Sequence, residues 1–463
     1  MRRAPIHTGY WLILASLLVL SAPASAFAVD LSFPEGLEMM QEGHEELLAA
    51  ARREESRREA LDAARGLYWP RIDARTRFTR MDDEITIDLN PIRQAMLKLH
   101  PTVPASVLPD FSLDVQDRSF WRSEVEMTWP IFTGGRITAA NRSARAGVEE
   151  AAAQKDRSVQ RLTSELVRRY FGLRVALRVL DVRQETLREL TEHLRQARLL
   201  EEAGVIARAE RLHAEVAYTE ADREVQGARK DVEIARIALA DIVGGIESYE
   251  PVSPLFMVHD LGPLDSLREG IAGGHPMLRE ASAKRAQADE GWKAERARWF
   301  PEVYLFGMRE LSRSDLTLLD PAWAVGVGAS VTLFDGGMRR HRILAAQGTQ
   351  REVALIEQRI KKEIVLLAEK RFRELLKAHE RFVSLQASLG LGEENLRTRR
   401  LAFREGLATS LDVVAAERSL SGIRVERLRS AFSFDVSLAE YLEACGQSAR
   451  FEAYRTIAAE EVP

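Results

Sequence analysis

The amino-acid sequence carries one pattern twice, and this duplication constrains the fold more than any other feature. Trp-Pro-Ile-Phe-Thr-Gly-Gly at 129–135 returns as Val-Thr-Leu-Phe-Asp-Gly-Gly at 331–337, an offset of 202 residues that also relates Gly204 to Gly406. Upstream the offset is 231 residues, because Tyr-Trp-Pro70 returns as Trp-Phe-Pro301. The first copy must therefore hold an insertion of 29 residues before the double glycine. A duplication of this size predicts a pseudo-symmetric architecture rather than two unrelated domains.

A secretory signal peptide is expected to precede the two copies. Residues 1–28 combine Arg2 and Arg3, an apolar stretch and small residues before Val29, which is the pattern of a cleaved leader. This predicts that the chain leaves the cytoplasm, with residues 29–245 forming repeat one and residues 246–463 forming repeat two. Cys445 is the one cysteine, so no disulfide can form within the chain.

Charge and hydropathy argue against two further possibilities. The chain has 66 basic and 70 acidic residues, which is too even a balance to indicate a nucleic-acid partner. After residue 28 no run of about 18 apolar residues appears, so a helical membrane span is not expected. Any part that spans a membrane would therefore have to consist of β-strands.

Each copy has the pattern of a long helical hairpin. Leucines recur every seven residues from Leu166 to Leu194, and apolar residues occupy the corresponding positions from Ala368 to Leu396. Such a repeat predicts a coiled-coil seam. Gly204 and its counterpart follow the long runs, and glycine ends helices because it adopts the left-handed backbone conformation at little cost. The main helices predicted on this basis are 34–66, 138–201, 210–243, 264–298 and 412–444.

Between the helical parts the hydrophobic period changes to two. Apolar and polar or small residues alternate at 72–78, 121–129 and 323–333, and 302–310 supplies a less regular fourth strand. Strands of about 10 residues with one apolar face suit a wall between lipid and water. Four strands cannot close a barrel, and open sheet edges are not tolerated in lipid. Closure by several copies related by cyclic symmetry is therefore expected.

The insertion in the first copy spans residues 81–119. It contains Asp82-Asp83-Glu84, a helical candidate at 91–100 and three prolines. It lies between two predicted strands on the side away from the helices, so it is predicted to be an extracellular loop. Two alternatives stay open at this point, a loop that folds over the mouth and a passive surface.

Together these features resemble the TolC family of outer-membrane efflux and secretion ducts. The resemblance rests on Leu-Phe-Asp-Gly-Gly and its counterpart, the glycine-ended hairpins and the two-copy layout, and it covers nearly all of the chain after residue 28. It implies a mainly α-helical chain with four transmembrane β-strands and two helical hairpins. It also implies a homotrimer, with a twelve-stranded β-barrel in the outer membrane of a Gram-negative bacterium that continues as an α-barrel through the periplasm.

The function implied by the resemblance is that of a passive exit duct without a cofactor. Such ducts serve tripartite efflux pumps or type I secretion systems, and their partners are a periplasmic adaptor (membrane fusion) protein and an inner-membrane RND or ABC transporter. In the family, the adaptor docks on the periplasmic tips of the hairpins. Carried over to this sequence, the tips are Gly204, Val205, Ile206, Ala207, Gly406, Leu407, Ala408 and Thr409.

The resemblance also places acidic residues at a constricted periplasmic entrance. Asp412 and Glu210 each follow a tip glycine by six positions, and Glu417 and Glu215 follow by eleven. The family commonly has a second aspartate one turn further on, and Ala415 stands there in this chain. Carboxylates from three copies would give a narrow passage a strong negative potential that favours cations.

Two alternatives for the residues beside the tips stay open. Glu210 and Asp412 would also favour the start of the return helix through its dipole, with no role at an entrance. Arg208 and Arg404 lie next to the tips and are candidates for links between the hairpins that hold the entrance shut.

The remaining conspicuous residues are expected to be structural. The double glycines lack the Lys-Ser/Thr pair of a phosphate-binding loop, so they are interpreted as strand-to-helix corners. His44 and His275 have no Cys or acidic partners at metal-ligand spacing, which favours a role at helix junctions. The predicted corner residues are Pro70, Gly134, Gly135, Pro301, Gly336 and Gly337.

Two other functions were weighed against the duct. A periplasmic coiled-coil adaptor or scaffold would also use a long helical hairpin, but it would carry one hairpin flanked by glycine-rich β-domains. An enzyme is not expected, because the sequence shows no Ser/His/Asp, metal-binding or phosphate-binding constellation. The sequence does not identify a cargo.

Overall fold

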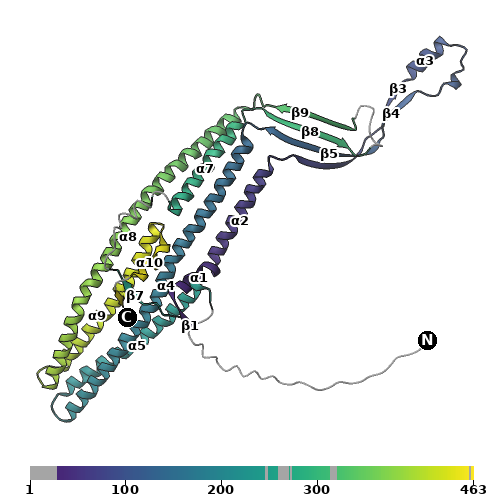
Figure 1. Cartoon of the computed structure of the whole chain (residues 1–463). Helices are drawn as coiled ribbons and strands as arrows, with labels where there is room; N and C mark the ends of the chain where they lie inside the picture. Colours follow the sequence, from purple (N-terminus) through teal and green to yellow (C-terminus); the bar gives the residue numbers. More distant parts are fainter. Residues whose placement is uncertain are drawn as a thin grey trace, which may run out of the picture.

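The computed structural model describes residues 29–245, 249–258, 271, 274–312, 321–457 and 460–462. The predicted signal peptide lies outside the described residues, as does the beginning of the helix predicted over 264–298. The molecule is elongated, with two helical hairpins side by side whose tips lie at one end and a β-sheet at the other end (Figure 1). None of the described helices combines the length and the apolar composition that crossing a membrane requires.

The two hairpins repeat each other closely. Hairpin one consists of α4 (Arg136–Glu202) and α5 (Arg208–Val243), and hairpin two of α8 (Met338–Arg404) and α9 (Ser410–Ala444). Helices α4 and α8 each have 67 residues, which at 1.5 Å per residue makes each about 100 Å long. The duplicated sequence therefore folds into duplicated helices. Helices α4, α5 and α9 lie within a few residues of their predicted positions, and α8 contains the predicted seam from Ala368 to Leu396.

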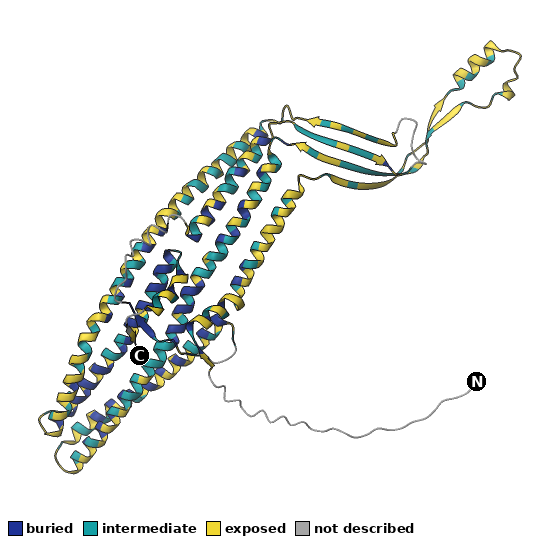
Figure 2. Ribbon diagram, in the orientation of Figure 1, coloured by how far each residue is buried: buried dark blue, intermediate teal, exposed yellow. Residues whose placement is uncertain are grey.

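The leucine seam holds the hairpins together. Leu166, Leu173 and Leu194 on α4 are buried, as are Leu375 and Phe382 on α8. Burial is concentrated where the hairpins face each other, while the outer faces of the helices are exposed (Figure 2). The seven-residue repeat thus correctly predicted the buried face, because a coiled-coil seam returns to the same side every two turns.

Three shorter helices flank the long ones, namely α1 (Phe33–Gly43), α2 (Glu45–Gly66) and α7 (Pro276–Ala297). The single helix predicted over 34–66 is wrong, because His44 adopts an extended conformation and divides it. The His44 ring Nδ1 accepts a hydrogen bond from the Glu46 backbone N–H at 3.2 Å. His275 Nδ1 accepts equally from Met277 at the start of α7. Each histidine is the N-cap of a helix, which confirms the predicted junction role.

A four-stranded antiparallel sheet follows the corners. The strands are β2 (Arg71–Arg80), β5 (Ser119–Phe132), β8 (Glu302–Glu310) and β9 (Trp323–Ser330), paired in the order β2-β5-β8-β9. All four predicted strands are present. The last was predicted to reach residue 333 and ends at Ser330 instead, opposite Glu302, the first residue of β8. Strands β2 and β9 are the edges of this sheet.

The insertion of the first copy projects beyond the sheet, away from the helices (Figure 1). It contains α3 (Asn90–Leu99), close to the predicted helix, and a hairpin of β3 (Ile85–Asp88) and β4 (Ser112–Gln116) that was not predicted. The Arg93 guanidinium ties α3 to the following turn, since its Nε donates to the Leu108 carbonyl at 3.0 Å. This part of the chain is therefore an ordered appendage.

The two ends of the described chain meet halfway along α4. Strand β1 (Val29–Leu31) pairs with β6 (Tyr249–Pro251), β7 (Leu255–Met257) pairs with β10 (Glu460–Val462), and α10 (Phe451–Thr456) lies beside them. The Tyr170 hydroxyl donates to the Leu31 carbonyl at 2.7 Å and accepts from the Ser253 N–H at 2.9 Å. Buried rings surround it and anchor both ends to hairpin one, namely Phe33, Phe171, Phe256 and Phe451.

Candidate functional site

The corners between sheet and helices need unusual backbone angles. All four residues of the double glycines have positive φ, from 64° to 93°, a region that other residues adopt at a cost. A Cβ on Gly134 would also lie 2.6 Å from the Ala297 carbonyl oxygen. Pro70 and Pro301 stand directly before β2 and β8. The predicted corner residues therefore lie where the chain passes between helix and strand.

Both tips end in the same backbone motif. Gly204 and Gly406 have φ of 72° and follow the long helices. The Val205 N–H donates to the Leu200 carbonyl at 2.8 Å, and the Leu407 N–H donates to the Ala402 carbonyl at 2.8 Å. This is the Schellman arrangement, which satisfies the last carbonyls of a helix. It leaves Val205 and Leu407 exposed at the end of the molecule.

The return helices start differently in the two hairpins. Helix α9 begins with a capping box, in which Thr409 accepts from the Asp412 N–H and the Asp412 carboxylate accepts from the Thr409 N–H. The Thr409 hydroxyl also donates to this carboxylate at 2.7 Å, and this hydrogen bond, together with that of the Thr409 N–H, lowers the pKa of Asp412. The N-cap residue of helix α5 is Ala207, whose side chain forms no capping hydrogen bond. Asp412 thus caps the start of its own helix, as one of the two alternatives for this residue expected.

Glu210 occupies the equivalent position in hairpin one but reaches across to hairpin two. Its Oε2 accepts a hydrogen bond from the Ser410 backbone N–H at 2.8 Å. Ser410 is fully buried and is the first residue of α9. A carboxylate is favourable at this position because helix N-terminal N–H groups are unpaired within the helix. Glu210 therefore joins the two tips.

His193 forms a second contact between the hairpins near the tips. Its Nε2 lies 2.8 Å from the Ser410 Oγ, and its ring packs against Phe403 with centroids 4.9 Å apart. Burial, together with the nearby Arg400 charge, lowers the pKa of His193 from 6.5 to about 4. The ring is therefore neutral at neutral pH, and protonating it would place a cation beside a guanidinium in a poorly solvated site.

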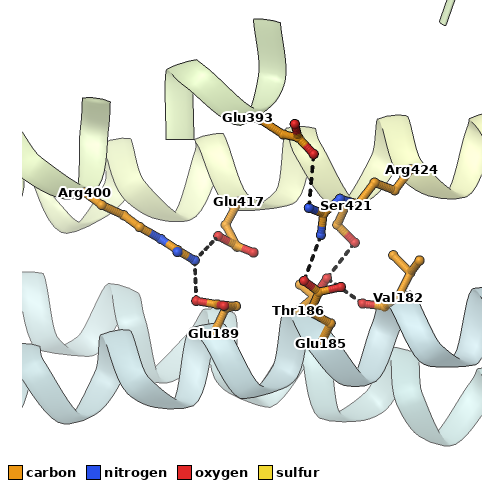
Figure 3. Close-up of polar contacts among 9 residues, drawn as sticks. All are labelled: Val182, Glu185, Thr186, Glu189, Glu393, Arg400, Glu417, Ser421 and Arg424. Atoms are coloured by element: carbon orange, nitrogen blue, oxygen red, sulfur yellow. Dashed lines mark hydrogen bonds and ion pairs between the residues drawn. The ribbon is translucent and has the colours of Figure 1, made fainter. Parts of the chain in front are cut away.

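Arg400 forms the central ion pairs between the hairpins (Figure 3). Its Nη2 lies 2.5 Å from Glu189 on α4 and 2.8 Å from Glu417 on α9. Burial raises the pKa of Glu417, against the opposing effect of Arg400. One turn away, Arg424 lies 3.1 Å from Glu185 and 3.4 Å from Glu393 (Figure 3). The two arginines connect three helices of the two hairpins.

Further hydrogen bonds join α4 of hairpin one to α9 of hairpin two beside these ion pairs. The Thr186 hydroxyl oxygen lies 2.9 Å from the Ser421 Oγ (Figure 3). Arg183 Nη1 donates to the same Ser421 oxygen at 3.2 Å. Both Thr186 and Ser421 are buried. The hairpins are thus joined by polar contacts over several turns, which we call the inter-hairpin row: Arg183, Thr186, Glu185, Glu189, His193, Glu210, Arg400, Ser410, Glu417, Ser421 and Arg424.

Three charged residues near the tip of hairpin one, Arg198, Arg211 and Glu215, form ion pairs within that hairpin. Arg211 Nε lies 2.6 Å from Glu201, and its Nη1 lies 2.5 Å from Glu215. Arg198, the counterpart of Arg400, is 3.8 Å from Glu215. Glu215 therefore pairs within hairpin one, whereas its counterpart Glu417 belongs to the inter-hairpin row.

The structure brings some of the predicted site residues together and leaves others apart. Glu210, Glu417 and the tip of hairpin two belong to one contact region. Arg208 and Arg404 are exposed and form no ion pair with any described residue of this single chain. Sequence reasoning missed the residues that do link the hairpins, above all Arg400 and His193. The duplication held one signal, because Arg400 and Glu417 match Arg198 and Glu215 at the offset of 202 residues.

Other chemistry was also sought at this site. A small cleft of about 220 Å³ lies beside the row and is lined by Glu189, Glu192, His193 and Arg400, among others. Within the described part of the chain, no group of three or more His, Cys, Asp or Glu side chains is arranged to hold a metal ion.

Comparison with known proteins gives one family and several relatives. The sequence model of the family described as outer membrane efflux protein matches residues 36–245 and 269–438. Protein CyaE of Bordetella pertussis is 28% identical over 250 residues, which are 50% of this chain and 51% of CyaE. The nickel-cobalt-cadmium resistance protein NccC of Alcaligenes xylosoxydans xylosoxydans is 27% identical over 210 residues, which are 45% of this chain and 47% of NccC. The chain thus spans about half the length of the curated relatives it matches.

The fold is shared with a protein of known structure. The crystal structure of CusC superposes with a TM-score of 0.75 at 15% sequence identity, over 91% of this chain and 93% of CusC. At this identity the likeness concerns the fold.

Proposed function

Since the chain belongs to the outer membrane efflux protein family, we propose that it is a passive exit duct of a tripartite efflux pump or a type I secretion system. Three copies would form a twelve-stranded barrel in the outer membrane of a Gram-negative bacterium. The hairpins would form an α-barrel that extends into the periplasm. The duct would act without catalysis and without a cofactor.

One observation carries this proposal, namely a four-stranded sheet with two open edges joined to two long hairpins. Strands β2 and β9 each have one neighbour in the sheet. In lipid an unpaired edge would leave backbone groups without hydrogen bonds, at several kcal/mol for each group. Closure by further copies removes this cost, and a symmetric ring does so with one kind of contact.

The tips are the proposed docking surface for a periplasmic adaptor, which would connect the duct to an inner-membrane RND or ABC transporter. Val205 and Leu407 support this role, because exposed apolar side chains at the end of a molecule are typical of protein interfaces. The proposed entrance lies just inside the tips and would be lined by acidic residues of three copies, namely Glu210, Glu215, Asp412 and Glu417. Arg208 and Arg404 would find partners across the ring in the assembled duct.

A periplasmic adaptor is the weaker alternative. The chain has two duplicated hairpins, where an adaptor would carry one. In its sheet, β2 and β5 alternate charged with uncharged residues, β9 alternates valine with small residues, and the strands have 8 to 14 residues. Both features favour a duct.

Valine at each tip glycine tests the docking role. Gly204→Val and Gly406→Val place a β-branched residue at positive φ and change the exposed loop, at a local cost of roughly 1–2 kcal/mol. We expect export to fall while trimers persist in the outer membrane. Gly227→Val is the matched control, because Gly227 lies within α5 and nothing surrounds its Cβ position. Normal export by both tip variants would contradict the docking role.

The cargo needs its own test. NccC is named for resistance to nickel, cobalt and cadmium, so these metals are the first candidates. We propose comparing the tolerance of a deletion strain and its complemented parent to each metal. Equal tolerance would remove these ions as cargo while leaving the duct untouched.

A further inference from the structure

We propose that neighbouring copies bind each other by repeating the contact that the two repeats of one chain already make, which fixes the pairing of β9 with β2 residue by residue. The inference rests on the proposed function, because it requires a ring of copies. Its partner is a second copy of this chain. The internal duplication supplies the template.

The template is the contact between repeat one and repeat two within the chain. Strand β5 of repeat one pairs with β8 of repeat two. Helix α4 packs along α7, and Gly134 fits against the corner that α7 and β8 form, where its Cβ would lie 2.8 Å from the Phe300 Cβ. The elements of repeat two that correspond to β5 and α4 are β9 and α8. The elements of repeat one that correspond to β8 and α7 are β2 and α2. Strands β9 and β2 are the edges of the sheet.

The offsets convert one register into the other. Adding 202 carries β5 onto β9, and subtracting 231 carries β8 onto β2. Within the chain Val125, Met127 and Trp129 lie opposite Arg309, Gly307 and Leu305. Between copies the pairs become Val327 opposite Phe78, Ala329 opposite Thr76 and Val331 opposite Ala74. The irregular pair Phe132 and Val303 becomes Phe334 opposite Ile72.

The strand faces support this register independently. It places the apolar face of β9 beside the apolar or uncharged face of β2, which carries Ile72, Ala74, Thr76 and Phe78. A slip of one residue would place that face beside the arginines at 71, 75 and 77, because side chains alternate along a strand. The duplication and the hydrophobic pattern therefore predict the same pairing.

The segment that follows β9 is exposed in the single chain, whereas its counterpart in repeat one is part of a strand. Phe132 at the end of β5 belongs to the strand and pairs with β8. Its counterpart Phe334 is 86% exposed, and Leu333 is 89% exposed. The strand predicted from the alternating pattern included Leu333. We infer that β9 extends to Phe334 when β2 of a second copy lies beside it.

The helices supply a charged pair for the same contact. Lys284 on α7 lies 3.7 Å from Glu150 on α4. The offsets convert these residues into Arg53 on α2 and Glu352 on α8, which again carry opposite charges. Both are exposed, and neither forms an ion pair among the described residues of the single chain. Leu355 is 66% exposed, whereas its counterpart Ala153 on α4 is buried, so α8 also carries an apolar side chain for this contact.

Cysteine pairs test the register. In a Cys445→Ser background, we would make Thr76→Cys with Ala329→Cys, and Arg75→Cys with Ser330→Cys. Adjacent pairs of an antiparallel ladder alternate in geometry, so one of these two has the closer Cβ atoms. The matched controls are Thr76→Cys with Val327→Cys and Thr76→Cys with Val331→Cys, which lie on the same face but two residues out of register. Their Cβ atoms are too far apart for a disulfide.

Oxidised outer membranes would be analysed by denaturing electrophoresis. The proposal predicts crosslinked dimers and trimers for an in-register pair, at least tenfold more than for either control. Stronger crosslinking of a control, or no crosslinking in preparations that native mass measurement shows to be trimeric, would overturn the register while leaving the duct in place. A protein that is not trimeric at all would overturn the register and the proposed function together.

Charge reversal tests the helical part of the contact. Arg53→Glu and Glu352→Arg should each shorten the lifetime of the trimer in mild detergent severalfold, and the double variant should regain most of it. Lys284→Glu is the comparison, because its partner lies in the same chain and the trimer lifetime should change less. Failure of the double variant to recover would contradict the pairing of Arg53 with Glu352.

Discussion

The two hairpin tips share one backbone motif but use their charges differently. In hairpin one, Arg211 pairs with Glu201 and Glu215 of the same hairpin. In hairpin two, Arg400 pairs with Glu417 and also with Glu189 of hairpin one. The two hairpins thus share one backbone scaffold but differ in side chains. As a result, Arg400 of hairpin two forms an ion pair with hairpin one, whereas Arg211 pairs within hairpin one. A movement of hairpin two away from hairpin one would have to break these contacts.

The largest effect is expected from removing the arginine of hairpin two. Arg400→Ala leaves the buried Glu417 and the partly exposed Glu189 without their cation, which should lower the local stability of the contact by about 2 kcal/mol. Hydrogen exchange of the first turns of α9 would then be roughly 30-fold faster. Arg198→Ala is the matched control, since its pair is longer and more exposed, and exposed pairs contribute little. Equal effects of the two variants would contradict the difference between the tips.

His193 should make the contact between the two hairpins depend on pH. The pKa of His193 is lowered from 6.5 to about 4, so the packed state favours the neutral ring. The contact is therefore fully stable above pH 6.5 and loses stability as the pH falls toward 4, with a loss of about 2 kcal/mol already reached near pH 5. Exchange rates of α9 measured between pH 4 and pH 7, corrected for intrinsic rates, would show this loss.

His193→Asn is the control for this pH dependence, because Asn395 is the residue at the equivalent position of hairpin two. The variant should remove most of the dependence. Glu417 has a raised pKa, so its protonation favours the packed state as the pH falls and acts in the opposite direction. Comparing the variant with the wild type at each pH cancels this contribution. An unchanged profile would exclude His193 as its source.

Replacing Glu210 should weaken the contact between the hairpins, whereas replacing Thr409 should destabilise only the start of α9 in hairpin two. Glu210→Ala removes the acceptor of the buried Ser410 N–H, which should cost about 1 kcal/mol. Exchange should then rise roughly fivefold at Ser410. Glu210→Gln keeps an acceptor oxygen and should retain most of the protection. If Glu210→Ala left Ser410 as protected as in the wild type, the contact across the tips would be refuted.

The smallest effect should come from making the two helix starts alike. Ala207→Ser gives α5 the side-chain cap that α9 already has, which should stabilise this tip by roughly 0.5–1 kcal/mol. Protease cleavage in the loop of hairpin one should slow by a few-fold. Thr409→Ala is the converse, with a loss of similar size in hairpin two. A faster cleavage of Ala207→Ser would show that the bare start of α5 is already satisfied in another way.

Much of the scaffold was predictable from the sequence because it depends on local periodicity. The heptad leucines, the alternating strands and the glycine stops each act within a few turns of chain, so α4, α5, α9 and the four strands lie close to their predicted positions. His44 shows the limit of this approach. Its neighbours are good helix formers, and the break depends on the ring accepting a backbone N–H, which a periodic pattern does not contain.

The contacts between hairpins were not predictable in the same way. Glu210 and Ser410 lie far apart in sequence, and the spacing alone does not say whether a carboxylate caps its own helix or the neighbouring one. Arg400 was hidden among the arginines of α8, which reads as a solvated face. The β3–β4 hairpin was missed because its strands have only 4 and 5 residues, so the alternation in each is too short to stand out.

The mass and location of the mature protein test the central claim most directly. The protein would be extracted with mild detergent from separated inner and outer membranes, and its native mass would be measured. The account predicts an outer-membrane particle with three times the mass of the mature chain. A monomer in the soluble periplasmic fraction would contradict it, because the open edges of the sheet would then have no copy to pair with.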